Sequence, residues 1–325
     1  MKKRLIIDVD TGSDDAMAVM LAHLSGQFEI VGLCSVQGNH AIEFTNENTL
    51  RLAAFLNMDC GVYKGSSYPM VSTLLPYRRP GIPSYETYPM DAHGLYLNLP
   101  AAPGKKNEKD SAVAFYVHYL REAERPVTIV AVGPLTNLGL ALRVDPTITK
   151  NIEEIVIMGG GYHECNCDPG AAEWNIWIDP EAANIVFRAG VPVTMMPIDA
   201  THQALVTAEE SRILRDMGTK AGIAAADMID GRIRAYDYGQ PMTIPHSAPI
   251  HDALCIAYLL DPSVITSSED FYCEVSCSPD ATDGATIMAD TETEKLKHPV
   301  PNVHVTLGCD RDKFVSMLMD AYSKY

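Results

Sequence analysis

Buried-strand and helix patterns alternate along the first two thirds of the chain. Apolar runs that predict buried strands lie at residues 4–10, 29–36, 61–64, 127–132, 154–158 and 191–198. Helical spacing of apolar residues predicts helices between them, at residues 14–24, 43–56, 111–124, 136–143 and 180–189. This alternation predicts an α/β fold of the open doubly wound type, with a central, mostly parallel sheet flanked by helices.

The last third has a different pattern. It predicts helices at residues 207–218, 223–238, 251–260 and 312–322, and short strands at 271–277, 284–289 and 303–307. We expect these strands to form a small antiparallel extension. No repeat or linker divides the chain, so one domain over residues 1–325 is expected. Two long loops, at 68–103 and 239–249, are predicted to be lids or binding segments.

Composition narrows the function classes. The 325 residues include 25 Lys and Arg against 42 Asp and Glu, a net charge of −17. This excess of acid argues against nucleic acid as a partner, since phosphate binding needs a basic face. No apolar run is long enough for a membrane helix. Eight cysteines are spread along the chain and no export signal is evident. We therefore expect reduced thiols and a cytoplasmic location.

The first predicted strand leads into four carboxylates within eight residues: Asp8, Asp10, Asp14 and Asp15. Ligands of open parallel sheets bind outside the carboxyl ends of the strands, which is where these acids lie. Close carboxylates repel one another or retain a proton unless a cation joins them. An all-oxygen set suits Ca²⁺ or Mg²⁺, so the segment predicts a divalent cation site.

Three other patterns could explain this acidic segment. An EF-hand loop starting at Asp8 requires Gly at its sixth and Glu at its twelfth position, where Ser13 and Val19 stand. A Mg²⁺-dependent phosphohydrolase with Asp8 as nucleophile is a closer match, although Gly12 replaces the expected Thr or Val. A helix cap with solvated acids is a third possibility.

Five segments together resemble one enzyme family. Residues 8–16 read DVDTGSDDA, and further matches follow in order: Gly38-Asn39, residues 132–138, residues 158–183 with Asn166 and the segment AAEWN, and His251-Asp252-Ala253. These motifs are similar to those of the nucleoside hydrolases of the inosine–uridine preferring type. The resemblance covers roughly residues 4–265.

The resemblance implies a metal centre and a general base. Asp10, Asp15 and Asp252, with the main-chain carbonyl of Val132, would bind one Ca²⁺. Because Ca²⁺ takes six to eight oxygen ligands, room remains for a water and two sugar hydroxyls. Asp10 would also accept the proton of the attacking water.

The remaining predicted site residues would contact the nucleoside. For the sugar, the resemblance implies Asp14, Asn39, Asn166, Glu173 and Asn175. Met158 is a further candidate for contact with the ribose, or else a core residue. The departing base needs a proton, for which His251 is the first candidate and His93 and His246 are weaker ones. Arg234, Tyr236 and Tyr238 are candidates for stacking on the base, or else exposed residues at a helix end.

These inferences predict a Ca²⁺-dependent hydrolase that converts a ribonucleoside to free base and ribose in purine or pyrimidine salvage. The resemblance also implies a homodimer or homotetramer. A non-catalytic nucleoside-binding protein is a further alternative beside the phosphohydrolase. Base preference is not predicted, because residues 93–98 are bulkier than in the usual family pattern.

Overall fold

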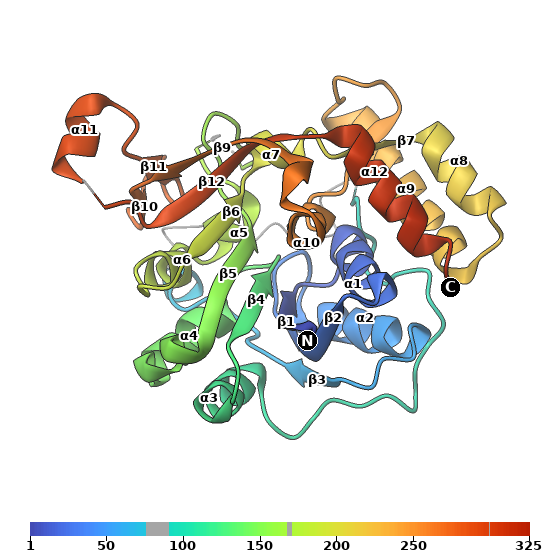
Figure 1. Cartoon of the computed structure of the whole chain (residues 1–325), viewed down its shortest axis with the longest axis horizontal. Coiled ribbons are helices and arrows are strands. Elements are labelled where there is room, and N and C mark those ends of the chain that lie inside the picture. The colour runs from blue at the N-terminus through green and yellow to red at the C-terminus, as the bar shows by residue number, and fades with distance from the viewer. Residues whose placement is uncertain (76–90, 168–170, 299) are drawn as a thin grey trace.

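The computed structural model describes residues 1–75, 91–167, 171–298 and 300–325. Among these residues, the main sheet has eight strands in the spatial order β3-β2-β1-β4-β5-β6-β12-β9 (Figure 1). Their bounds are Gly61–Lys64, Phe28–Ser35, Lys3–Val9, Val127–Ala131, Ile152–Met158, Val193–Met196, Val303–Cys309 and Ile265–Phe271. All neighbours pair in parallel except β9, which runs antiparallel to β12 at the sheet edge.

The order of the strands sets where a ligand can bind. The chain winds outward from β1 to β3 and then returns to place β4 on the other side of β1. This reversal leaves a crevice between the helices that follow the carboxyl ends of β1 and β4. The acidic segment 10–15 follows β1, and Val132 follows β4. The two segments therefore meet at the position where open α/β sheets bind their ligands.

Strand alternation divides the core into two layers, one on each face of the sheet. Leu5, Ile7 and Val9 pack on one face, whereas Ile6 packs on the other. The first face is covered by α1 (Ser13–Ser25), α2 (Ile42–Phe55), α9 (Lys220–Gly239), α10 (Ala253–Leu260) and α12 (Arg311–Tyr322). The second face is covered by α3 (Ala112–Glu122), α4 (Thr136–Val144) and α6 (Pro180–Phe187). The doubly wound prediction is confirmed.

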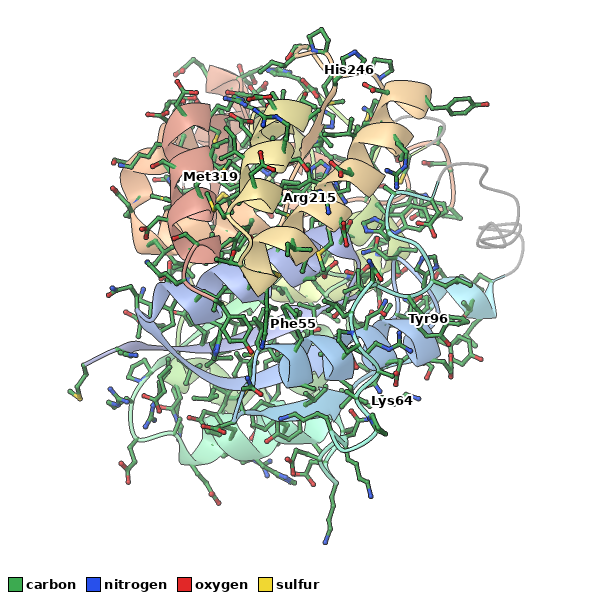
Figure 2. All side chains as sticks on the ribbon, turned by 90° about the vertical axis from the view of Figure 1, so that its right-hand side faces the viewer. Phe55, Lys64, Tyr96, Arg215, His246 and Met319 are labelled. Carbon is green, nitrogen blue, oxygen red and sulfur yellow. The ribbon has the colours of Figure 1, made fainter. Side chains whose placement is uncertain are left out.

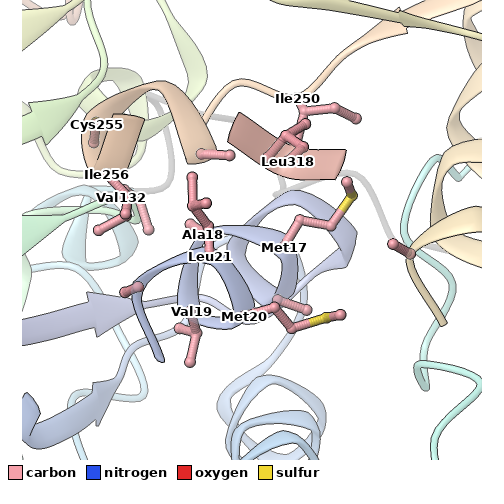
Figure 3. Close-up of a cluster of buried hydrophobic side chains, with 14 of the residues drawn as sticks. Met17, Ala18, Val19, Met20, Leu21, Val132, Ile250, Cys255, Ile256 and Leu318 are labelled. Atoms are coloured by element: carbon pink, nitrogen blue, oxygen red, sulfur yellow. The ribbon is translucent and has the colours of Figure 1, made fainter. Parts of the chain in front are cut away.

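Helix α1 is buried along its whole inner length. Met17 to Leu21 lie in one cluster with Ile256 of α10 and Leu318 of α12 (Figure 3). Because α10 begins directly after Asp252, this packing fixes the distance between the start of α1 and that residue. The core thus positions two acidic segments that are more than 230 residues apart in the sequence.

Helices α8 (Ala208–Asp216) and α9 form a pair above α1 and α2 in Figure 2. Arg215 of α8 makes ion pairs with Asp227 and Asp230 of α9, at 2.7 and 2.8 Å. Ser211 of α8 also donates to Asp230, at 2.6 Å. These contacts fix the rotation of α9 about its axis, which decides which of its residues face inward.

The late region departs from the expected pattern in several places. The predicted strand at 271–277 corresponds to β10 (Cys273–Val275), whereas β9 ends at Phe271, where the prediction begins. Residues 303–307, expected in the antiparallel extension, belong to β12, which pairs in parallel with β6 in the main sheet. The antiparallel part of the fold consists of β9 at the edge of the main sheet and of two small pairs. These are β10 with β11 (Thr286–Met288), and β7 (Leu205–Thr207) with β8 (Ser247–Pro249). The structure also contains elements that were not predicted: α5 (Trp174–Ile178), α7 (Ile198–Thr201), β7, β8, β9 and α11 (Glu292–Lys297).

Of the two predicted loops, the first is described in part and the second in full. Residues 76–90 of the 68–103 loop lie outside the described residues. The segment 239–249 is shorter than expected as a loop, because α9 extends to Gly239 and β8 begins at Ser247. Within the described part of the chain, no helix combines the length and the apolar character that crossing a bilayer requires.

Candidate active site

The acidic segment after β1 folds back on itself. Asp10, Asp14 and Asp15 are all buried. Asp15, in the first turn of α1, accepts hydrogen bonds from the main-chain N–H of Asp10 at 3.0 Å and of Gly12 at 2.9 Å. The bond from Gly12 belongs to a capping box, and the two bonds together tie the loop after β1 to the first turn of α1. The cap therefore aims the carboxylates of this turn toward the crevice.

Asp10 is held between two glycines. A Cβ atom at Gly38 would lie 2.2 Å from Asp10 Oδ2, and one at Gly133 would lie 2.7 Å from Oδ1. Only glycine allows so close an approach at these two positions. The main-chain N–H of Asn39 donates to Oδ2 at 2.6 Å. Asp10 therefore has one fixed orientation, and burial, followed by the charge of Asp15, raises its pKa well above its ordinary value.

Three carboxylates converge in a way that fits a metal ion. Asp14, Asp15 and Asp252 each offer an oxygen, and these oxygens lie within 4.8 Å of one another. All three side chains are buried, and the donor set is of hard oxygen atoms, which suits Ca²⁺ or Mg²⁺. Asp252 is brought here by the start of α10. The site thus fits a divalent cation, and it includes Asp14 beside the predicted ligands Asp15 and Asp252.

The pKa values of this cluster diverge. Burial and the charge of Asp14 raise the pKa of Asp15 to about 7. Burial, Asp14 and Asp15 raise the pKa of Asp252 well above its ordinary value. Burial is the largest single influence on Asp14 too and opposes its ionisation, but Arg232, His93 and His251 together outweigh burial, so the pKa of Asp14 is lowered. Crowded acids that resist ionisation are those that a cation would stabilise most.

One wall of the site is made of amides and main-chain carbonyls. Asn175 donates through Nδ2 to the carbonyl of Val132 at 2.8 Å and to that of Met158 at 3.2 Å. Glu173 caps α5, accepting from the N–H of Asn175 at 2.9 Å and of Gly160 at 3.0 Å. Burial raises the pKa of Glu173 to about 7. The carbonyls and side chains of this wall are held rigidly by one another.

These groups line a cavity of about 260 Å³. Most predicted site residues lie on its surface: Asp14, Asn39, His93, Val132, Met158, Asn166, Glu173, Asn175, His251 and Asp252. Asp10 and Asp15 lie behind the surface, at 1% and 0% exposure. The structure therefore brings together residues from seven separate segments that the sequence had only suggested belong to one site.

The prediction for α9 needs a correction. Arg234 and Tyr238 lie outside this cavity: Arg234 lines a neighbouring hollow, and Tyr238 is 70% exposed. Of the three candidates on this helix, only Tyr236 lines the cavity, together with Arg232 one helical turn before it. The reason is the rotation of α9 set by α8, which turns Asp227 and Asp230 toward Arg215 and the opposite side toward the site.

His93 and His251, with Tyr236, line another part of the cavity, which we call the histidine wall. His251 has both ring nitrogens in hydrogen bonds, Nδ1 with the hydroxyl of Thr201 at 2.7 Å and Nε2 with that of Tyr236 at 2.8 Å. Burial and the nearby Arg232 lower the pKa of His251 well below its ordinary value. His93 accepts from the N–H of Ser13 at 3.2 Å, and burial lowers its pKa to about 4. His246 lies at the outer surface (Figure 2), with its side chain 77% exposed.

Sequence reasoning missed Arg232 and the pair of His40 and Asp91, whose Nε2 and Oδ2 lie 3.0 Å apart at the edge of the cavity. The spacing of Arg232 and Tyr236 on a helix was a usable signal for the first. No local pattern pointed to the second, since its partners are 51 positions apart and meet only in the folded chain.

Asp8, the nucleophile of the phosphohydrolase alternative, does not line the cavity. It shares the sheet face of Ile6, where its carboxylate accepts from Tyr116 of α3 at 3.0 Å and from Asn137 of α4 at 3.1 Å. Burial raises its pKa to about 7. Strand alternation has placed this acid against the second layer of helices, away from the site.

Comparisons with known proteins bear on this geometry. The family model of the inosine-uridine preferring nucleoside hydrolases matches residues 5–316. The chain is 34% identical to the pyrimidine-specific ribonucleoside hydrolase RihA of Escherichia coli O1:K1, over 99% of this chain and 98% of that protein. Among solved structures, a purine-preferring ribonucleoside hydrolase from Gardnerella vaginalis superposes with a TM-score of 0.85 and 33% identity, covering 99% of this chain and 98% of its own. A plant nucleoside hydrolase, PpNRh1, superposes over both whole chains with a TM-score of 0.84 and 25% identity.

Proposed function

The chain belongs to the family of inosine-uridine preferring nucleoside hydrolases, enzymes that act on N-glycosidic bonds, and we propose that it splits ribonucleosides into free base and ribose with the help of a bound Ca²⁺. The observation that carries the proposal is the convergence of Asp14, Asp15 and Asp252 beside Val132 in a single cavity. One relative is named for pyrimidines and one for purines at nearly equal identity. The proposal therefore covers ribonucleosides of both classes.

Asp15, Asp252 and the carbonyl of Val132, with Asp10, would hold the metal. Bound Ca²⁺ supplies a concentrated positive charge that orients sugar hydroxyls and makes a neighbouring water more acidic. Asp10 suits the role of general base, because its carboxylate is fixed by Asn39 and by the close approach of Gly38 and Gly133. A fixed acceptor within hydrogen-bond reach of a water is what general base catalysis requires.

The wall of amides and main-chain carbonyls is proposed to bind ribose together with Asp14, Asn39 and Asn166. Asp14, Asn39, Asn166, Glu173 and Asn175 offer carboxylate and amide oxygens on the cavity surface, and Met158 lies among them. Cleavage of the glycosidic bond develops positive charge on the sugar ring, as in glycoside hydrolysis. Oxygen atoms already fixed around the ring stabilise that charge without reorganising.

The histidine wall is proposed to receive the base. His251 and Tyr236 share a hydrogen bond there, and His93 lies at the same end. His251, hydrogen-bonded to the hydroxyl of Tyr236, would deliver a proton to the departing base. The salvage role, the homodimer or homotetramer and the cytoplasmic location belong to the proposal as well.

One assay tests the proposal against both alternatives. The purified protein is incubated with uridine, cytidine, inosine and guanosine and with their 5′-monophosphates, with and without a calcium chelator. Reducing sugar and free phosphate are then measured. We expect ribose from the nucleosides and its loss on chelation. Release of phosphate alone would favour the Asp8 phosphohydrolase, and tight binding without any product would favour a nucleoside-binding protein.

A further inference from the structure

A buried guanidinium lies against the acidic segment. Arg232 is 1% exposed and is the largest of the fully buried side chains in the described part of the chain. Its Nη1 lies 2.9 Å from Oδ1 of Asp14. Among the described residues that line the cavity, Arg232 is the only Arg or Lys. One of the four neighbouring carboxylates therefore has a permanent cationic partner, since Arg does not lose its proton in proteins.

Arg232 cannot move to another carboxylate without breaking several contacts. Its Nε donates to the carbonyl of Pro249 at 3.0 Å, and its Nη1 also donates to the hydroxyl of Ser13 at 3.2 Å. The ring of Tyr236 lies 5.5 Å from its Cζ. The guanidinium is thus tethered by the end of β8, by the start of α1 and by its own helix. In this fixed position the guanidinium forms its ion pair with Asp14.

Geometry alone does not separate Asp14 from the other acids. Its carboxylate oxygen lies within 4.8 Å of those of Asp15 and Asp252, so all three could share one ion. Asp10 adds a fourth acid near Asp252. Four carboxylates exceed the charge of one divalent cation by two, and each further carboxylate raises the affinity of such a site. The fixed positive charge is what distinguishes Asp14.

We propose that Arg232 is a positioning residue that withholds Asp14 from the metal, keeps it for a sugar hydroxyl and limits how tightly the cluster binds a divalent cation. This inference rests on the proposed function, because it requires a cation at the cluster. It makes an uncommon prediction. Loss of Arg232 tightens metal binding while it impairs sugar recognition.

The first test is calorimetric titration of Ca²⁺ into chelator-treated protein. Arg232→Met removes the charge, Arg232→Lys keeps it, and Arg234→Met is the matched control on the same helix outside the cavity. We expect Arg232→Met to bind Ca²⁺ at least about ten-fold tighter. The variant lacks the repulsion between the guanidinium and the ion, and at a separation of a few ångströms this repulsion exceeds the free energy that corresponds to a ten-fold change in Kd. Arg232→Lys and Arg234→Met are expected to stay within about three-fold of the parent protein.

The second test compares a ribonucleoside with its 2′-deoxy analogue. A site built to pair a hydroxyl strongly rejects the analogue that lacks it. We expect the ratio of kcat/KM for uridine over 2′-deoxyuridine to fall about ten-fold in Arg232→Met and to stay unchanged in Arg234→Met. Should Arg232→Met fail to fold, Arg232→Gln replaces it. Glutamine is uncharged but can still donate to Ser13 or Pro249, and the same two results are expected of it.

The outcomes separate this inference from the proposed function. Parent protein that binds Ca²⁺ and releases ribose, together with neutral variants whose Ca²⁺ affinity is unchanged or weaker, would overturn the role of Arg232 alone. Parent protein that binds no Ca²⁺ would overturn the metal part of the proposed function and this inference with it. Tighter Ca²⁺ binding in the neutral variants, with a lowered preference for the ribonucleoside, supports the inference.

Discussion

Two walls of the cavity are built in different ways. The carboxylate wall comes mainly from one continuous segment, residues 10–15, whose shape is set by a strand end and a helix cap. The histidine wall is assembled from residues 91–93, α9 and His251, and Arg232 and Tyr236 of α9 face inward because α9 is rotated by its packing on α8. The carboxylate wall therefore depends on local structure and the histidine wall on tertiary contacts. We expect substitutions in the first to affect chemistry and metal binding, and those in the second to affect the leaving base.

The largest effect is expected at Asp10. Asp10→Asn keeps the size and the hydrogen bond from Asn39 but loses the proton acceptor. Turnover should fall about 10²–10⁴-fold, the usual contribution of a general base. Steady-state kinetics and circular dichroism check this prediction. A variant with near-normal kcat and native ellipticity would remove Asp10 as base and would weaken the contrast between the walls.

Metal binding should be affected most at Asp252. Loss of one ionic ligand in Asp252→Asn is expected to weaken Ca²⁺ binding on the order of 100-fold. Without metal the variant should be no less stable than the parent, because burial and neighbouring acids already raise the pKa of Asp252. Thermal unfolding with and without Ca²⁺ measures both effects. An undiminished rise of Tm with Ca²⁺ in the variant would show that Asp252 is not a ligand.

Two matched substitutions on α9 test the histidine wall. Tyr236→Phe removes the hydroxyl that bonds His251 Nε2 at 2.8 Å, whereas Tyr238→Phe alters an exposed ring on the same helix. We expect kcat for inosine or uridine to fall about ten-fold in Tyr236→Phe, by loss of a hydrogen bond worth about 1 kcal/mol or slightly more. Tyr238→Phe should be unchanged. Equal effects in both variants would contradict the rotation of α9 described above.

The smallest effect on turnover is expected at Asp8. Asp8→Asn resembles the protonated acid, so kcat should stay within about two-fold, and at a pH of about 4 stability should stay within about 1 kcal/mol of the parent. Burial raises the pKa of Asp8 to about 7 in the folded state, against 3.8 for the carboxyl group in the unfolded chain. The parent therefore loses stability as the pH rises between these two values. The stability of Asp8→Asn relative to the parent should therefore improve between pH 5 and pH 8. Urea unfolding of calcium-free protein measures this, and a large loss of turnover would revive the nucleophile hypothesis.

The sequence by itself determined the alternating strands and helices and the acidic segment after β1, because periodicity and caps act over a few residues. The first eleven predicted elements match the structure within about two residues at most of their ends. The resemblance to known motifs added Asn39, Asn175 and Asp252, all of which lie on the cavity surface. The single domain and the oligomeric state stay predictions.

Only the tertiary structure decided which of these side chains meet. Asp8 and Asp10 are two positions apart, yet one contacts α3 and α4 while the other lies at the crevice, because the strand ends between them at Val9. Of the candidates on α9, Tyr236 lines the cavity with Arg232, whereas Arg234 and Tyr238 lie outside it, because α8 fixes the rotation of α9. Such choices depend on packing between segments far apart in the chain, and no local pattern encodes that packing.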